Sequence, residues 1–598
     1  MNIQLLIRKI RTSFLWLCGI LAPLPWGGVG GGLLVSCSDF DDYNKEVADV
    51  TPSANQTLWE NIQQNGQLSD FAALLKKAGF DDELSQSHYY TVWAPLNGTF
   101  DASQYQGLNN NALLRQFVKN HIADYGHSAS EAIDEHVKML NEKTYDFIGT
   151  SSYTFGDRTV AQPNIPSNNG LMHTLNGSLV FYPNIYEYVT DSLLAIGKDI
   201  DSLRHYVLAY EQTYLDETAS VPGSIVDGMQ TYVDSVIVTS NSLWRDMNIQ
   251  MNNEDSTYTV LLPNNKAWLD GYNRIKDCYK YATTTKAQIF ENGSIASNPA
   301  SINVDPAFWQ DSLTCRQLMR NLFFSNNDAY NTWMEGTPSP YGSDTLRTTL
   351  RNKLSNPKEI MQQARHTVEF SNGKALVVDS LAMYPWETYS PERIAQAASS
   401  DNIGRVVTGS TETFRVHLEN SEQEDFSYLH VIPSGSFGRP ELDLLLPNVQ
   451  STTYDIYCVF VPPIDNLNAE LLPNRVIFTL NYCDASGNLK DVELLDESEE
   501  NISSFQERFN LPDNASNRTT IRAFSNDPTR IDTLYVGEFT FPVCYAGLGN
   551  DYRPNIKITS PFSVFNKNLT SAFTRDLRIA SIILRPKEMD AAYGLNDK

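Results

Sequence analysis

Cys37 is the residue whose position gives the clearest chemical expectation in this chain. It follows an apolar stretch that runs from Phe14 to Val35, three positive residues at positions 8, 9 and 11, and the small residue Ser36. A charged start, an apolar middle and a small residue before the cut are the features of a secretory signal, which is removed from the mature protein. We therefore expect cleavage before Cys37. An uncleaved membrane anchor is the alternative, but the prolines and glycines of the stretch argue against a stable spanning helix.

The segment Leu34-Val35-Ser36-Cys37 resembles the bacterial lipoprotein signal, in which the cysteine is diacylated on sulfur and acylated on its new amino group. The resemblance implies that Cys37 is the lipidation site and that the chain is held to a membrane, since each buried methylene contributes about 0.8 kcal/mol. The acidic run from Ser38 to Asp42 resembles the export tag of Bacteroidota lipoproteins, which implies an outer-membrane, lipid-anchored protein exposed at the cell surface. A solvated acidic tether over residues 37–53 is the other interpretation.

The histidines do not form a metal-binding or catalytic pattern. Nine are scattered along the chain, and His121 and His127 are six residues apart, which does not place both on one helical face. His121 lies on an apolar helical face and His173 in a strand, where packing is the favoured role. The HExxH, GxSxG and P-loop motifs do not occur. We expect no catalytic residue, no metal and no cofactor.

Three other groups of polar residues are candidates for a site. Ser436 lacks the flanking strand and helix of a nucleophile elbow, so a loop is expected. The acidic run 496–500 lacks the alternating ligands and turn glycine of a calcium loop, so a solvated charge run is expected. No tryptophan follows Trp386, so tyrosines would have to stack on a sugar, although each is expected more often in the core or at its rim. These tyrosines are Tyr428, Tyr482, Tyr535, Tyr545 and Tyr552. The ligand-binding residues stay unknown.

Composition excludes several classes of protein. The length of 598 residues allows three to four domains, and a content of 41% hydrophobic and 11% aromatic residues indicates a globular chain. The formal charge is -26, and loss of the three positive residues of the signal leaves 42 basic against 71 acidic residues, or -29. Nucleic acid is therefore not expected as a partner. Five cysteines follow Cys37 without a CxxC pair, which excludes a disulfide framework or zinc site and leaves one optional bridge open.

An internal repeat organises the first two-thirds of the chain. Three short segments recur in the same order, and the second copy holds 33 extra residues between the first and second of them, around positions 277–311. We interpret this as two copies of one domain, the second with an insertion. The matched pairs are residues 91–97 with 259–265, residues 115–120 with 316–321, and Asn169-Gly170 with Asn372-Gly373.

Local patterns predict a mixed α+β domain in each copy. Apolar spacing predicts a helix over residues 68–78, with Ser69 as N-cap and Gly79 as its end. A second helix is expected near residues 110–121, introduced by Asn110 and Asn111. Residues 90–93 predict a short strand, and each Asn-Gly pair predicts a hairpin turn followed by a strand.

These segments resemble the fasciclin, or FAS1, domain. The family has an early helix, seen here over Leu68 to Phe80, and a strand reading TVFAPTN.AF, seen over Thr91 to Phe100 and again over Thr259 to Trp268. Its late G..H.i...L strand is matched by residues 170–179. The second copy departs from the pattern, because Leu376 replaces the late histidine and the insertion is large. The family implies adhesion or ligand display at cell surfaces, and it supplies no binding residue that can be transferred to a numbered position.

The last third is expected to be an all-β sandwich. Strand-like runs separated by turn residues occupy it, and the closing run resembles the last strand of galactose-binding-like jelly rolls. Residues 454–461 are apolar on nearly both faces, as in a central strand covered on both sides. The expected strands are residues 413–418, 454–461, 476–482, 520–524, 534–541, 556–559 and 577–584.

The whole sequence thus predicts a multidomain chain of two α+β fasciclin-like domains followed by the sandwich. The expected divisions are a signal peptide at 1–36, a tether at 37–53, fasciclin-like domains at 54–188 and 189–393, and the sandwich at 400–598. The expected function is non-catalytic adhesion or extracellular ligand binding, with other surface proteins, a glycan or a peptide as partners. One alternative is an accessory glycan- or peptide-binding lipoprotein of an outer-membrane nutrient-import system, and another is a hydrolase with its site in the sandwich.

Overall fold

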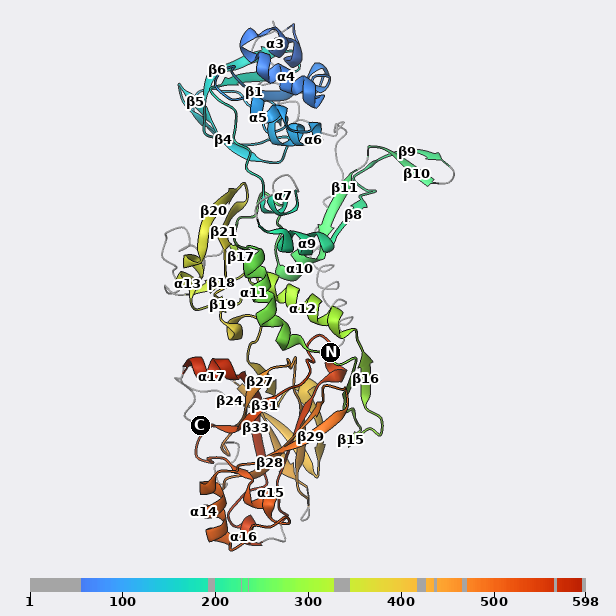
Figure 1. Ribbon diagram of the computed structural model, residues 1–598, viewed down its shortest axis with the longest axis vertical. Helices are drawn as coiled ribbons and strands as arrows, with labels where there is room; N and C mark the ends of the chain where they lie inside the picture. Colours follow the sequence, from blue (N-terminus) through green and yellow to red (C-terminus); the bar gives the residue numbers. More distant parts are fainter. Residues whose placement is uncertain are drawn as a thin grey trace, which may run out of the picture. The chain divides into compact units, whose positions relative to one another are not determined.

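The computed structural model describes residues 55–191, 199–226, 229–234, 236–326, 345–416, 426–434, 438–464, 470–563 and 567–593 (Figure 1). The chain forms two compact units that meet in sequence between Phe181 and Tyr182. The expected signal peptide, Cys37, the tether and Ser436 lie outside the described residues. In the part of the chain that is described, no helix is long and apolar enough to cross a membrane.

The first unit is built on a seven-stranded sheet with the order β2-β1-β7-β6-β5-β4-β3. β1 pairs in parallel with β7, while the other pairings are antiparallel. Successive residues of a strand point to opposite faces, so Val92 joins the core beneath the helices and Trp93 joins a second core on the other face. The strands are β1 Tyr90–Pro95, β2 Ile122–Asp124, β3 Ile133–Lys138, β4 Thr144–Gly149, β5 Tyr153–Phe155, β6 Arg158–Ser167 and β7 Gly170–Leu175.

Two helices cover the face of the sheet that carries Val92, and their ends are capped in different ways. The helix α3 (Leu58–Gln64) begins with a capping box between Thr57 and Glu60. The helix α4 (Ser69–Ala78) ends at Gly79, which has a φ of +72° as expected for a left-handed cap. The expected capping role of Ser69 is wrong, because Ser69 is already helical. Its place is taken by Asn97, whose side chain accepts the Asp70 N–H at 3.0 Å.

The helix expected near residues 110–121 is shorter than predicted. Asn109, rather than Asn110 or Asn111, caps α6 (Asn110–Leu113) by accepting the Ala112 N–H at 2.9 Å. The chain then continues as a π-helical turn, η3 (Leu114–Val118). Two further short elements in this region are α5 (Ser103–Gln106) and η2 (Glu83–Ser85).

The second unit contains a four-stranded sheet with the order β17-β12-β21-β20. Its pairings repeat those of β2-β1-β7-β6, because β12 is parallel to β21 and antiparallel to β17, and β20 is antiparallel to β21. The strands are β12 Tyr258–Pro263, β17 Phe323–Ser325, β20 Ala364–Phe370 and β21 Gly373–Val378, and the helices around them are α7 Ile185–Thr190, α9 Asp201–Ala209, α10 Ser242–Met247, α11 Asn265–Ile275, α12 Pro306–Arg320 and α13 Pro357–Gln362.

The first residue of β7 and of β21 lies very close to the backbone of the strand paired in parallel with it. A Cβ atom at Gly170 would lie 2.2 Å from the carbonyl oxygen of Tyr90, and one at Gly373 would lie 1.9 Å from that of Tyr258. No other residue type fits such a contact without moving the paired strand. Both glycines therefore serve the same parallel pairing.

The asparagine before each glycine holds the same three-way junction. The Asn169 side chain accepts the Leu58 N–H at 2.7 Å and donates to the carbonyl oxygens of residues 84 and 86. The Asn372 side chain accepts the Ile185 N–H at 3.0 Å and donates to the carbonyl oxygens of residues 251 and 253. Each asparagine thus joins a helix start and a loop to the sheet, so the frame of the first unit recurs in the second.

Two segments of the second unit have no counterpart in the first. One is an arm of paired strands, β8 (Glu211–Leu215) with β11 (Ile237–Asn241) and β9 (Val221–Val226) with β10 (Met229–Asp234), which projects from the helices in Figure 1. The other spans residues 276–305 and holds η4 (Lys276–Tyr279) and four short strands. These are β13 Thr284–Ala287, β14 Phe290–Glu291, β15 Ser294–Ile295 and β16 Ala300–Asn303.

The C-terminal third holds two six-stranded antiparallel sheets that share one hydrophobic core. One has the order β24-β25-β33-β27-β31 with β22 beside β33, and the other has the order β23-β26-β32-β28-β29 with β30 beside β28. The first sheet comprises β22 Arg393–Gln396, β24 Gly409–Val416, β25 Phe426–Pro433, β27 Thr453–Phe460, β31 Asp532–Thr540 and β33 Leu577–Pro586. The second comprises β23 Ile403–Val407, β26 Glu441–Leu445, β28 Arg475–Cys483, β29 Leu489–Leu494, β30 Phe524–Ser525 and β32 Asn555–Thr559.

The strand expected over residues 520–524 is wrong. Residues 518–521 form the helix α15, and only Phe524 and Ser525 pair as β30. The Arg475 side chain binds the carbonyl oxygens of Thr520 and Ile521, which removes those groups from a strand ladder. Tertiary context therefore overrides the strand propensity of Thr519, Thr520 and Ile521.

The 276–305 insertion attaches the second copy to the sandwich. The Ser451 side chain accepts the Lys280 N–H at 2.8 Å, and the Tyr281 hydroxyl donates to the Ala546 carbonyl oxygen at 2.6 Å. Gly487, in the turn between β28 and β29, lies so close to Thr284 that a Cβ atom there would be 1.9 Å from its carbonyl oxygen. Residues 182–598 accordingly form one compact unit.

Candidate functional site

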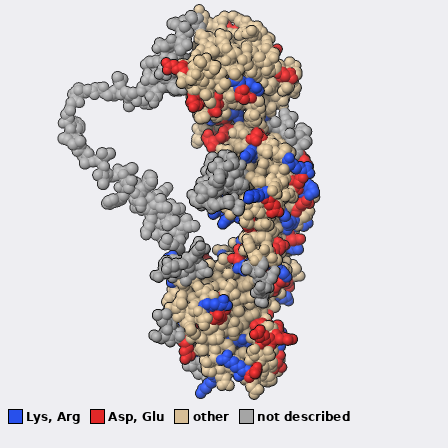
Figure 2. Space-filling view, turned by 90° about the vertical axis from the view of Figure 1, so that its left-hand side faces the viewer, with Lys and Arg blue, Asp and Glu red and all other residues tan. Residues whose placement is uncertain are grey.

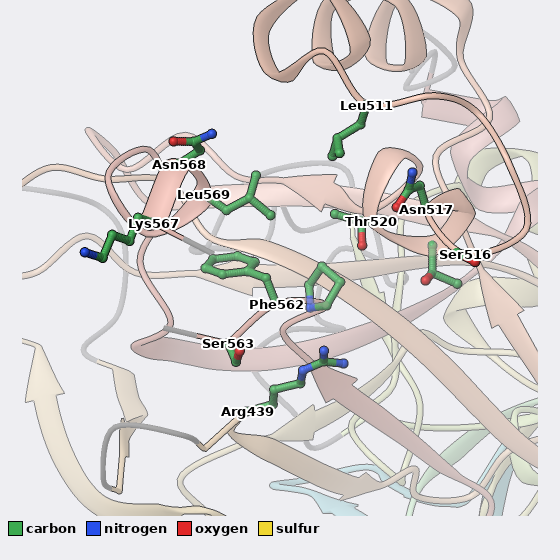
Figure 3. Close-up of a pocket in the computed structure, with 12 residues that line it drawn as sticks. Arg439, Leu511, Ser516, Asn517, Thr520, Phe562, Ser563, Lys567, Asn568 and Leu569 are labelled. Atoms are coloured by element: carbon green, nitrogen blue, oxygen red, sulfur yellow. The ribbon is translucent and has the colours of Figure 1, made fainter. Parts of the chain in front are cut away.

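A polar pocket of about 750 Å³ lies beside the helical cap of the C-terminal sandwich (Figure 3). Its lining comes from three separate parts of the chain, which are Arg439 two residues before β26, residues within 511–520, and residues 561–563 with 567–569 beyond β32. The lining residues are Arg439, Leu511, Ser516, Asn517, Thr519, Thr520, Pro561, Phe562, Ser563, Lys567, Asn568 and Leu569.

A small hydrophobic core holds this cap together. The helices are α14 (Glu499–Phe509), α15 (Arg518–Ile521) and α16 (Lys567–Thr570). Their apolar side chains meet in one cluster of buried residues, which comprises Phe505, Ile521, Phe562, Leu569, Ala572 and Phe573. Since Phe562 and Leu569 belong both to this core and to the pocket wall, the core fixes that wall in place.

Arg475 fastens the cap to strand β28. Its guanidinium lies 4.3 Å from the ring centroid of Phe505 and donates to Asn501 Oδ1 at 2.9 Å, to Ser525 Oγ at 3.0 Å, and to the carbonyl oxygens of Thr520 and Ile521. Burial lowers the pKa of Arg475 to about 10, so it stays charged at neutral pH. The hydrogen bonds that the charged guanidinium donates, together with its contact with the face of the Phe505 ring, compensate for the water that Arg475 loses on burial.

The acidic run at residues 496–500 is part of the same cap. Ser498 caps α14, and Glu497 accepts from Arg518 at 2.9 Å and from Arg522 at 2.6 Å. Arg522 also binds both carboxylate oxygens of Asp513 at 2.7 Å, which ties down the loop that follows α14. These contacts lower the pKa of the Glu497 carboxyl, with the Arg518 hydrogen bond as the largest cause. The run lies at the surface, as expected of a solvated charge run, and it also starts a helix and pairs with arginines.

The two cations of the pocket differ in direction. In Figure 3 the Arg439 guanidinium points toward the other lining side chains, while the Lys567 ammonium points away from them. The remaining polar groups are hydroxyls and amides, and the twelve described lining residues include no carboxylate, imidazole or thiol. This lining offers hydrogen bonds and one inward positive charge, which suits recognition of an anionic or polar group rather than proton transfer.

The five tyrosines proposed for sugar stacking do not line this pocket. Tyr428 and Tyr545 are 1% and 3% exposed, and the Tyr545 hydroxyl accepts the Cys483 N–H in the core. Tyr482 packs edge-on against Phe539, and the Tyr535 hydroxyl donates to Asp455 at 3.1 Å. Tyr552 lines a different pocket of about 390 Å³, beside the insertion. Sequence reasoning missed the pocket because its residues come from three distant segments.

His121 and His173 occupy the interior of the first unit. His121 Nδ1 donates to the Phe117 carbonyl oxygen at 2.7 Å and its Nε2 accepts the Leu179 N–H at 3.0 Å. His173 Nε2 donates to the His127 carbonyl oxygen at 2.8 Å, and its Nδ1 accepts the Asn164 N–H. Both rings are therefore neutral and bound to the backbone on both sides. Burial lowers the pKa of each to about 4.

The cysteines and the surface charges point to no further centre. The five cysteines at positions 278, 315, 458, 483 and 544 are free and buried. Among the described residues, no group of three or more His, Cys, Asp or Glu side chains is arranged to hold a metal ion. On the face shown in Figure 2, acidic and basic side chains are interspersed with wider areas of uncharged surface.

Comparison with known proteins identifies one family. Residues 66–181 match the family model of the fasciclin domain. A solved structure, that of a FAS1 domain pair from the insect cell adhesion molecule fasciclin I, is 15% identical and covers 54% of this chain and 99% of its own, with a TM-score of 0.19. A TM-score this low carries no argument. No curated protein matches the chain. The protein therefore contains a fasciclin domain within its first unit and is multidomain, with many β-sheets elsewhere.

Proposed function

We propose that this protein is a non-catalytic, lipid-anchored protein of the outer cell surface that mediates adhesion or binds an extracellular ligand. The observation that carries the proposal is the fasciclin domain at residues 66–181, because such domains are adhesion modules. The proposed membrane anchor is a lipid attached to Cys37. This part of the proposal is supported by the signal-like sequence that precedes Cys37. Because membership of a domain family does not by itself establish a function, the experiment has to measure binding directly.

The proposal includes a second fasciclin-like domain and a C-terminal sandwich of the galactose-binding-like jelly-roll type. The repeated strand order, the paired glycines Gly170 and Gly373, and the paired asparagines Asn169 and Asn372 support the second domain. The two six-stranded sheets around one core support the sandwich.

The second candidate function is an accessory glycan- or peptide-binding lipoprotein of an outer-membrane nutrient-import system. The polar pocket of the sandwich favours it, because Arg439 and the surrounding amides and hydroxyls would hold a carboxylate-bearing sugar or an acidic peptide. A hydrolase site receives no support from this pocket, whose described lining supplies no general base.

Substitution of Arg439 tests the ligand-binding form of the proposal. We expect the soluble chain from Asp39 onward to bind an anionic glycan or peptide on an array, and Arg439→Gln to weaken that binding about tenfold, the value of one charge-assisted hydrogen bond. Lys567→Gln is the matched control, since it removes one positive charge that points away from the pocket. Equal loss in both variants would show a general charge effect. No binding by either would leave adhesion to other surface proteins, which pull-downs from intact cells would measure.

The anchor is tested separately at Cys37. We expect Cys37→Ser to abolish incorporation of labelled fatty acid and to move the protein from the membrane fraction to the soluble fraction, because the thiol that carries the acyl chains is lost. Ser38→Ala serves as the control for a neighbouring change. Retention of the Cys37→Ser protein in the membrane fraction would instead indicate an uncleaved N-terminal anchor.

A further inference from the structure

The two copies of the fasciclin frame differ at one face of an equivalent helix. Asn97 accepts the N–H of Asp70 in α4, and Asn265 accepts the N–H of Ser202 in α9, so these two helices align residue by residue. Leu74 and Ala78 of the first helix then correspond to Tyr206 and Tyr210 of the second. Two small or aliphatic side chains are thus replaced by two aromatic rings.

These tyrosines line a cleft of about 910 Å³ in the second unit. The ring centroid of Tyr206 lies 5.1 Å from that of Tyr210 and 5.7 Å from that of Trp268, a residue of α11. Phe308 of α12 lines the same cleft and is 66% exposed. Single exposed apolar side chains are common on protein surfaces, but here Phe308 lines one open space together with Tyr206 and Tyr210.

The corresponding part of the first unit is filled by its own side chains. Phe100, which occupies the position of Trp268, stacks 5.8 Å from the fully buried Phe117. Lys77 of α4 reaches across to the carbonyl oxygen of Leu108 at 3.0 Å. The second helix has Ala209 at the position of Lys77, and Ala209 lines the cleft. The second copy therefore leaves open a place that the first copy covers.

Polar groups of the cleft suit a ligand rich in hydroxyls. Asp201 and Asp311 supply carboxylate oxygens that accept hydrogen bonds, and Ser202 and Ser312 supply hydroxyls. The two aspartates outnumber the single arginine, Arg204, whose Nε donates to the Thr190 carbonyl oxygen at 3.3 Å. Such a lining disfavours an anion and favours a neutral ligand that donates hydrogen bonds.

We propose that this cleft binds a pyranose ring of an uncharged oligosaccharide, with the C–H face of the sugar against the aromatic rings and its hydroxyls donating to Asp201 and Asp311. The positive hydrogens of that face meet the negative face of a π-system, and the carboxylates satisfy the hydroxyls that would otherwise lose water. The site is separate from the Arg439 pocket and takes a ligand of different charge.

Exchange of residues between the two copies provides the test. Tyr206→Leu with Tyr210→Ala places the first copy's own residues on the second copy's helix, so the fold is expected to persist. The soluble chain from Asp39 onward would be titrated by calorimetry with cellohexaose, xylohexaose, mannohexaose, laminarihexaose and chitohexaose. We expect saturable binding of at least one of these, and a loss of affinity of about tenfold or more in the double variant, as removal of two stacking rings implies.

Two further variants make the outcome decisive. Arg439→Gln is expected to leave this binding unchanged, which separates the cleft from the pocket of the sandwich. Asp311→Asn is expected to weaken binding several-fold while keeping the shape of the site, because the amide is a poorer acceptor than the carboxylate. Failure of the intact chain to bind any of the five hexasaccharides would overturn the proposal, as would equal affinity in the intact chain and a folded Tyr206→Leu, Tyr210→Ala variant.

Discussion

Acidification from pH 6.5 to pH 4 is expected to remove about 6 kcal/mol of stability from the first unit. Burial lowers the pKa of His121 and of His173 from 6.5 to about 4, and His127 adds a smaller electrostatic contribution to the shift of His173. One pKa unit corresponds to about 1.4 kcal/mol, so each ring contributes about 3 kcal/mol. A typical domain has about 5–15 kcal/mol in total, so this loss would bring the unit close to unfolding.

The sign follows from the neutral state of both rings in the fold. Above pH 6.5 the unfolded chain also has neutral histidines, so their full contribution is present. Between pH 6.5 and pH 4 the unfolded chain binds protons that the folded unit excludes, and stability falls as the pH falls. Below about pH 4 both states are protonated at these rings, and they cause no further loss.

Hydrogen exchange of peptides from residues 55–181 would measure this effect at a series of pH values. The variant His121→Gln retains a donor and an acceptor but does not titrate in this range, so it should have about half the pH dependence of the wild type. Its stability at pH 8 serves as the control, since the prediction concerns the slope rather than the absolute value. Equal slopes in variant and wild type would contradict it.

Replacement of Asn169 or Asn372 by alanine is expected to cost about 3–5 kcal/mol in the unit that contains the residue. Asn169 is 3% exposed and Asn372 is 1% exposed, and each makes three hydrogen bonds to backbone groups. Truncation leaves a buried N–H and two carbonyl oxygens without that partner, and each such group costs about 1–3 kcal/mol. Partial access of water explains why the total is less than the full sum.

Urea unfolding monitored by hydrogen exchange would place each loss in its own unit. Asn169→Ala should destabilise peptides from residues 55–181 and Asn372→Ala those from residues 182–598. Asn176→Ala is the control, because its exposed side chain makes one hydrogen bond, to Thr159 Oγ1, and should change stability by less than about 1 kcal/mol. A loss no larger than that of the control would show that the junction is not a main source of stability.

Local chemistry made part of this structure predictable from sequence. Gly170 and Gly373 marked the same turn in each copy, and the spacing of apolar residues marked the face of α4. The cap of that helix could not be foreseen, because it comes from Asn97, 27 residues away from Asp70. In the same way, the helix α15 depends on Arg475, which is far from it along the chain.

The candidate sites were harder to predict for the same reason. Pocket residues such as Arg439 and Phe562 lie in segments with no shared pattern, and only the sandwich brings them together. The aromatic cleft did carry a signal in the sequence. Alignment of the two copies over the early helix pairs Leu74 with Tyr206 and Ala78 with Tyr210, but that comparison requires the start of the second helix to be known.

The insertion at residues 276–305 has a consequence for how this protein can change in evolution. A duplicated domain alone yields modules that recombination can exchange freely. Here Lys280 and Tyr281 of the insertion bind Ser451 and Ala546 of the sandwich. A recombination breakpoint between the two would leave each with buried groups exposed and partners missing. We therefore expect residues 182–598, which form one compact unit, to be inherited as one piece.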